Sequence, residues 1–123
     1  MKDINYTITL GELTDVCRYF PVDLPVYFDN GQHPDYIDSW RGIYSELALN
    51  HSSEGEPMAC GDFVSMLEEA DGKTFTGYKG GDYKMDGNTD VWMDNYGEYT
   101  SMTISGARIM DNRVVLCTIR EDS

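Results

Sequence analysis

One candidate for ligand chemistry is an arginine that stands among aromatic residues. Arg41 lies between Trp40 and Tyr44, with Tyr36 a few positions earlier. A guanidinium flanked by rings can grip a phosphate or a carboxylate while it stacks on an aromatic face. A structural ion pair with one of the many acids of the chain is the alternative. Arg41 and Tyr44 are therefore candidate binding residues, and both interpretations stay open here.

A second candidate is the glycine-rich segment 77–84, with the sequence GYKGGDYK. Successive glycines allow backbone N–H groups to converge on an anion, lysines supply charge, and tyrosines can stack on a base. An ordinary tight loop has the same composition. The candidate binding residues of this segment are Tyr78, Lys79 and Tyr83. The preceding Gly-Lys-Thr at 72–74 is not a Walker A motif, because Leu67 occupies the position of the motif's first glycine.

A third pattern is a set of acids that recur at every fourth position, namely Asp82, Asp86, Asp90 and Asp94. Glycines among them oppose a helix. Loop carboxylates can bind Ca²⁺, but the ligand order of an EF-hand is absent. We therefore predict surface acids that are candidates for contact with a partner, and no metal site.

Catalytic motifs are lacking. The two histidines, His33 and His51, fall in predicted loops, and no C-x-x-C, H-E-x-x-H or G-x-S-x-G occurs. We therefore predict no catalytic residue, no cofactor and no enzymatic activity. A metal-dependent nucleotide hydrolase ranks lowest among the functions considered, because no ligand spacing supports it.

Composition limits the classes of partner. The 123 residues fit a single domain, 1–123, and hold 22 acidic against 9 basic residues, a formal net charge of −13. Such a charge disfavours direct binding to nucleic acid or to an anionic membrane, and it favours a partner with a basic surface. No run of apolar residues is long enough to cross a bilayer, and the N-terminus is too polar for a signal peptide.

The three cysteines are predicted to be unpaired thiols in a reducing cytoplasm. Cys17, Cys60 and Cys117 are widely spaced and odd in number. We expect Cys17 and Cys117 to be buried.

The N-terminal half predicts one helix and two strands. Thr9 and Glu12 have the spacing of a capping box, and an apolar stripe follows at Leu10, Leu13, Val16, Cys17 and Phe20. Pro21 then ends the helix. A strand is expected over 24–29 with a turn at 29–31, and a second strand over 38–49.

The C-terminal half predicts a helix and a hairpin. The helix spans about Cys60 to Ala70, with Gly72 as its C′ residue. Short strands are expected near 75–78 and 91–93, joined by loops. Strands 101–110 and 113–120 flank Asp111-Asn112, which favours a tight turn. The fold class is α+β, with two short helices on one face of a mostly antiparallel sheet and a C-terminal β-hairpin.

Two blocks of sequence carry a resemblance to a known family. They are SWRGIYSELAL at 39–49 and GKTFTGYKGGDYKM at 72–85, supported by TDVW at 89–92 and by the closing hairpin. The chain thereby resembles a family of small bacteriophage-encoded proteins, over most of its length from Gly11 onward. The resemblance implies a phage origin, the cytoplasm of a bacterial host, and no particular activity. It highlights Arg41, Tyr44, Tyr78, Lys79 and Tyr83.

These observations favour an accessory protein that acts by binding. The leading hypothesis is inhibition of a host defence or nucleic-acid-processing machine, of anti-CRISPR or anti-restriction type, in which carboxylates mimic phosphates. The partner would be a nuclease or CRISPR effector with a basic surface. The alternative is a small-molecule site, built on Arg41 and Lys79, that sequesters a nucleotide signal. The sequence leaves self-association open.

Overall fold

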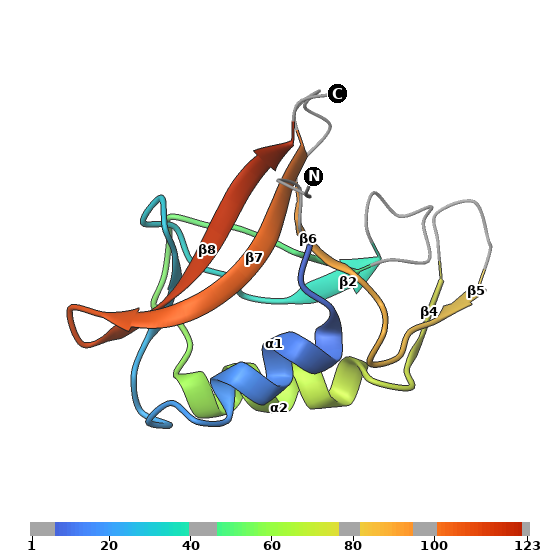
Figure 1. Ribbon diagram of the computed structural model, residues 1–123, viewed down its shortest axis with the longest axis horizontal. Helices are drawn as coiled ribbons and strands as arrows, with labels where there is room; N and C mark the ends of the chain where they lie inside the picture. Colours follow the sequence, from blue (N-terminus) through green and yellow to red (C-terminus); the bar gives the residue numbers. More distant parts are fainter. Residues whose placement is uncertain (1–6, 40–46, 77–81, 95–100, 122–123) are drawn as a thin grey trace, which may run out of the picture.

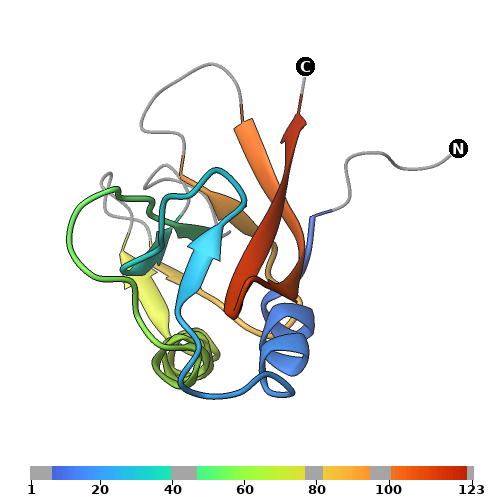
Figure 2. The ribbon, with the colours of Figure 1, turned by 90° about the vertical axis from the view of Figure 1, so that its left-hand side faces the viewer.

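The computed structural model describes residues 7–39, 47–76, 82–94 and 101–121. Within them, two helices lie on one side of a strongly curled, six-stranded mixed sheet (Figures 1 and 2). A separate two-stranded sheet, β4 (Thr74–Thr76) with β5 (Asp82–Lys84), extends from the end of the second helix. The α+β class predicted from the sequence is confirmed.

Helix α1 (Leu10–Cys17) begins at the predicted capping box. The Glu12 amide donates to the Thr9 hydroxyl at 3.2 Å, and the Thr9 amide donates to the Glu12 carboxylate at 3.0 Å. The buried stripe differs from the prediction at two positions, because Phe20 lies beyond the end of α1 and is only partly buried, and because Val16 is exposed. Val16 is 36% exposed, whereas Thr14 is buried and donates its hydroxyl to the Leu10 carbonyl at 2.7 Å. A threonine can occupy a core position because this internal hydrogen bond satisfies its hydroxyl.

Helix α2 (Cys60–Ala70) has the predicted bounds, and Gly72 after it has φ +84°. Its buried side chains include Phe63 and Leu67, which face the sheet together with Leu13 of α1. Since these three side chains are fully buried, they form the contact between the helical layer and the sheet.

The six-stranded sheet has the order β1-β8-β7-β6-β3-β2. Its strands in that order are Val26–Phe28, Arg113–Glu121, Ser101–Met110, Val91–Met93, Leu47–Leu49 and Ile37–Ser39. The pairs β1–β8 and β3–β6 are parallel, and the other three are antiparallel. The predominance of antiparallel pairs is confirmed. A register shift between Ile104 and Gly106 of β7 accompanies the curl of the sheet.

The hairpin of β7 and β8 turns at the predicted dipeptide. Asp111 and Asn112 have φ values of 54° and 59°. Positive φ at both central residues is the hallmark of a type I′ turn, which matches the twist of the flanking strands. Asp and Asn tolerate this conformation better than other residues that carry a Cβ atom.

Replacing Asn112 by alanine is expected to lower the free energy of unfolding by about 1 kcal/mol. Alanine is strained at positive φ, whereas asparagine tolerates this conformation because its short polar side chain can hydrogen-bond locally. Urea unfolding would measure the loss. Asn112→Gly is the matched control, since glycine adopts positive φ without strain, and it should be at least as stable as the parent. Equal stabilities of the alanine and glycine variants would contradict this account of the turn.

The predicted single strand over 38–49 is wrong. Ile37 pairs with Leu49 and Ser39 with Leu47, so the two ends of the segment form an antiparallel pair, β2 and β3. Leu47, Ala48 and Leu49 are all buried because β3 lies between β2 and β6. Burial on both faces of β3 replaces the alternation of a half-exposed strand, so the residue pattern does not mark where the segment divides.

Two smaller corrections concern residues 82–84 and the cysteines. Residues 82–84 form β5 where loops were expected, through pairing of Phe75 with Tyr83. The strands expected near 75–78 and at 91–93 are present as β4 and β6. Cys17 is buried as predicted, but Cys117 is half-buried, and all three cysteines are free thiols.

Candidate interaction surface

The two helices lie side by side and enclose a groove on the face of α2 that adjoins α1. It has a volume of about 330 Å³. The described residues that line it are Leu10, Gly11, Thr14, Asp15, Arg18, Glu68 and Asp71. Three carboxylates and one guanidinium therefore meet in the described part of the groove, and its charge is predominantly negative.

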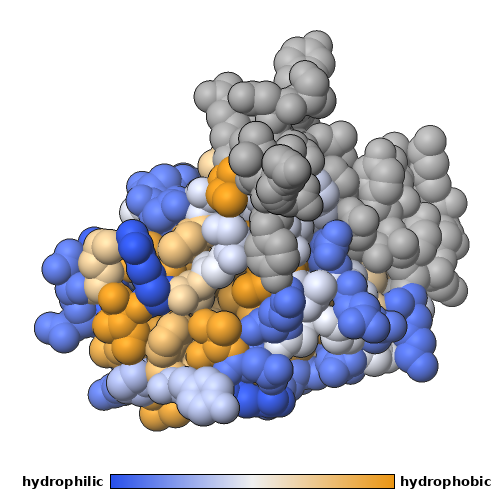
Figure 3. Space-filling view, in the orientation of Figure 1, coloured by the Kyte–Doolittle hydropathy of each residue, from blue (hydrophilic) through white to orange (hydrophobic). Residues whose placement is uncertain are grey.

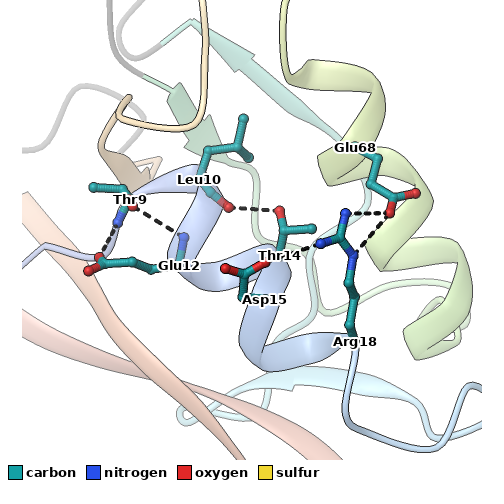
Figure 4. A network of polar contacts seen from close by, with 7 residues as sticks. All are labelled: Thr9, Leu10, Glu12, Thr14, Asp15, Arg18 and Glu68. Atoms are coloured by element: carbon teal, nitrogen blue, oxygen red, sulfur yellow. Dashed lines mark hydrogen bonds and ion pairs between the residues drawn. The ribbon is translucent and has the colours of Figure 1, made fainter.

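Arg18 joins the two walls of the groove (Figure 4). Its Nη2 and Nε atoms both donate to Glu68 Oε2, at 2.9 and 3.2 Å, and its Nη1 donates to Asp15 Oδ1 at 3.1 Å. The hydrogen bond to Glu68 raises the pKa of Arg18, so the guanidinium stays charged. All three side chains are about half exposed or more, so water screens these pairs and they add little to stability.

A glycine lets the chain approach the start of α1. The Gly11 amide donates to the Gly87 carbonyl at 2.9 Å, and a Cβ atom on Gly11 would lie 3.0 Å from that oxygen. The Leu10 amide also donates to the Thr89 carbonyl. The loop that precedes β6 is therefore fixed to the helix, and it closes one end of the helical layer.

Exposed apolar side chains follow Arg18 of the groove closely in the sequence. Tyr19 is 90% exposed and Val22 is 71% exposed, both just after α1, while Val16 on α1 is half-exposed. Figure 3 shows hydrophilic side chains gathered where α1 begins and α2 ends, and apolar side chains gathered where the β7–β8 hairpin ends beside α1. A hydrophilic region therefore adjoins an apolar one on the face that Figure 3 shows.

The acids at the end of α2 oppose the helix dipole. Glu68, Glu69 and Asp71 are exposed at its C-terminal end, and the last turn of this fully described helix contains no basic residue. Negative charge at a helix C-terminus costs about 0.3–1 kcal/mol for each residue, since the last carbonyls already carry partial negative charge. The helix dipole therefore does not account for these acids, although Glu68 gains the ion pair with Arg18.

Four of the nine binding residues predicted from the sequence lie outside the part of the chain that the structure describes. They are Arg41, Tyr44, Tyr78 and Lys79. Asp82 and Tyr83 lie in β5, where Asp82 pairs with Thr76 and Tyr83 pairs with Phe75.

The remaining predicted acids occupy three different settings. Asp86 is exposed, and its carboxylate accepts from the Asn88 amide at 2.8 Å, so it shapes the turn before β6. Asp90 forms a backbone bridge with Thr9, and Asp94 follows β6 with its amide bonded to the Leu49 carbonyl. These three acids tie the strand β6 to its neighbours through backbone and turn contacts.

The histidines do not form a metal site with other described residues. His33 is 3% exposed, its Nδ1 lies 3.0 Å from Asp35 Oδ1, and its buried Nε2 has no partner among the described residues. The described residues contain no group of three or more His, Cys, Asp or Glu side chains that could hold a metal ion.

Sequence reasoning did not single out the groove. One signal was available, because Asp15 and Arg18 lie three positions apart on one face of the predicted helix. The pairing of Arg18 with Glu68, however, spans 50 positions and depends on how the helices pack.

Comparison with protein-family models, with curated proteins and with solved structures finds no match to this chain. The resemblance to a bacteriophage family therefore stays a prediction. Neither helix in the described part of the chain has the length and apolar character required to cross a membrane.

Proposed function

We propose that this protein is a binding protein that inhibits a host defence or nucleic-acid-processing machine by occupying a basic surface of its partner. The proposal places the contact on the α1–α2 groove and the exposed apolar side chains that follow Arg18. The observation that carries it is the group of acids at the end of α2, which helix energetics disfavours. Glu68 uses part of this charge within the fold, where it pairs with Arg18, and the charge of the other acids supports a role in contact with a partner.

The charge of the groove suits a nucleic-acid-binding channel. Asp15, Glu68 and Asp71 face one space, and Arg18 neutralises part of their charge. Carboxylates at a protein surface can take the place of backbone phosphates, and the net charge of −13 extends their attraction toward a basic partner. The net charge of the chain would thus attract a basic partner, and the carboxylates of the groove would orient it.

The apolar neighbours would supply contact area after the encounter. Aromatic residues are enriched at protein interfaces, and charged rims mainly raise the rate of association. Tyr19 combines an exposed ring with a position directly after Arg18. Val22 lies three residues further on and is also exposed.

Capture from bacterial lysate with the immobilised chain tests this function. Mass spectrometry would identify both the retained proteins and the retained nucleotides. The variant Asp15→Asn/Glu68→Gln/Asp71→Asn removes three charges from the groove. The control Glu54→Gln/Glu56→Gln/Asp111→Asn removes three exposed charges that do not line it.

The proposal requires a retained nucleic-acid-binding protein that is lost with the groove variant, kept with the control, and displaced by duplex DNA. Equal retention by both variants would exclude the groove as the contact. A retained nucleotide that is lost in Arg41→Ala and Lys79→Ala variants would instead favour the small-molecule site.

A further inference from the structure

Two of the three cysteines meet at the junction of the helices. Cys17 is the last residue of α1 and Cys60 is the first residue of α2, 43 positions later, and each is 1% exposed. The Cys60 thiol donates to the Cys17 carbonyl oxygen at 3.5 Å, and the two residues line the same cavity. The two cysteines are therefore neighbours in the folded chain.

The backbone holds the two cysteines in this position. The Cys60 amide donates to the Leu24 carbonyl at 2.7 Å, and the Gly61 amide donates to the Val22 carbonyl at 2.9 Å. These bonds fasten the start of α2 to the segment that follows α1. The backbone therefore keeps Cys60 beside the end of α1.

The two thiols have different chemical characters. Burial raises the pKa of Cys17 to about 12. Burial also raises the pKa of Cys60, but its hydrogen bond with Cys17 acts in the opposite direction. Burial therefore disfavours the thiolate at both positions, and less strongly at Cys60, where the contact with Cys17 opposes the effect of burial.

A small cavity leads to both residues. It has a volume of about 220 Å³ and is lined by Cys17, Arg18, Phe20, Val22, Cys60, Gly61 and Val64. A water molecule occupies about 30 Å³ in the liquid, so the cavity admits hydrogen peroxide readily. Bulky oxidants such as glutathione disulfide do not fit within it.

We propose that Cys17 and Cys60 are a modification site at which a peroxide converts a buried dithiol into a disulfide that cross-links the end of α1 to the start of α2. The Cys60 thiolate attacks one peroxide oxygen, the O–O bond breaks, and the sulfur becomes a sulfenic acid as water leaves. Cys17 then attacks this sulfur, the S–O bond breaks, and a second water leaves. Two thiols lose two electrons, and one peroxide is reduced to two waters. This inference is independent of the proposed function.

Treatment of the reduced full-length chain with hydrogen peroxide tests the site. The intact mass should fall by two hydrogens, and a peptide map without reductant should link residues 17 and 60. The melting temperature should rise on the order of 10 °C, since the cross-link closes a long loop of the unfolded chain, and reductant should reverse the rise.

Cys117→Ser is the matched control and should cross-link as the parent does, because this thiol lies on β8. Cys17→Ala and Cys60→Ala should not lose the two hydrogens, and circular dichroism would confirm that they are folded. The peptide map of the parent chain tests the link even if neither alanine variant folds. Oxidation of Cys60 to a sulfinic acid without the link, or a link that includes Cys117, would overturn the proposal.

Discussion

Association with a captured basic partner is expected to slow by a factor of about 10 or more when Asp15, Glu68 and Asp71 are neutralised together. Electrostatic steering raises rates of association by factors of about 10 to 10³. The triple variant leaves Arg18 without its two carboxylate partners, so the described lining of the groove changes from net negative to net positive. Surface plasmon resonance would give both rates, and the dissociation rate should change much less.

Salt provides a second measurement of the same effect. Raising the ionic strength from 0.1 M to 1 M shortens the Debye length from about 10 Å to about 3 Å. The association rate of the parent chain should fall steeply over this range, and that of the triple variant should fall less. The Glu54→Gln/Glu56→Gln/Asp111→Asn control carries the same change in total charge. If it slows association as much as the groove variant does, total charge and not the groove steers the encounter.

Replacement of Phe63 by alanine is expected to lower the free energy of unfolding by about 3–5 kcal/mol. Phe63 is fully buried on α2 and belongs to the cluster that joins the helices to the sheet. Truncation removes the ring from its contacts and leaves a cavity that close-packed neighbours fill only in part. Because small domains are stable by about 5–15 kcal/mol, urea unfolding should show a large shift of the midpoint.

Tyr19→Ala is the matched control for this prediction. Its ring is 90% exposed, so the free energy of unfolding should change by less than about 0.5 kcal/mol. The same variant should weaken binding to the partner if Tyr19 belongs to the interface. A small effect of Phe63→Ala together with a large effect of Tyr19→Ala on stability would contradict the packing described above.

Local signals predicted the parts of the fold that depend on few neighbouring residues. The capping box of Thr9 and Glu12 placed the start of α1, and Asp111-Asn112 placed the hairpin turn. Gly72 likewise marked the end of α2. In each case the conformation is determined within a few residues by hydrogen bonding or by tolerance of positive φ.

Non-local pairing was the part that the sequence did not predict. The parallel pairs β1–β8 and β3–β6 join segments far apart in the chain, and three-residue strands carry too few side chains for a clear alternation. Leu47, Ala48 and Leu49 are buried on both faces, so their pattern did not show where the segment 38–49 is divided.

The prediction of the candidate site shows the same contrast between local signals and non-local contacts. Arg41 and Lys79 were singled out by local composition and lie outside the described residues. The groove was not singled out, because Arg18 and Glu68 meet only through the packing of α1 on α2. Recognition of such a surface requires the fold.

The parallel pairing of β1 with β8 has a consequence for biosynthesis. Val26 and Phe28 are paired with Val114 and Leu116, and the Ile8 amide donates to the Ile104 carbonyl. A ribosome must therefore translate residue 116 before the first strand acquires its neighbour. Until then the nascent chain carries β1 as an unsatisfied edge with two apolar side chains that are later buried. Folding of this protein is consequently completed only after most of its synthesis, and its first strand leaves apolar side chains uncovered until then.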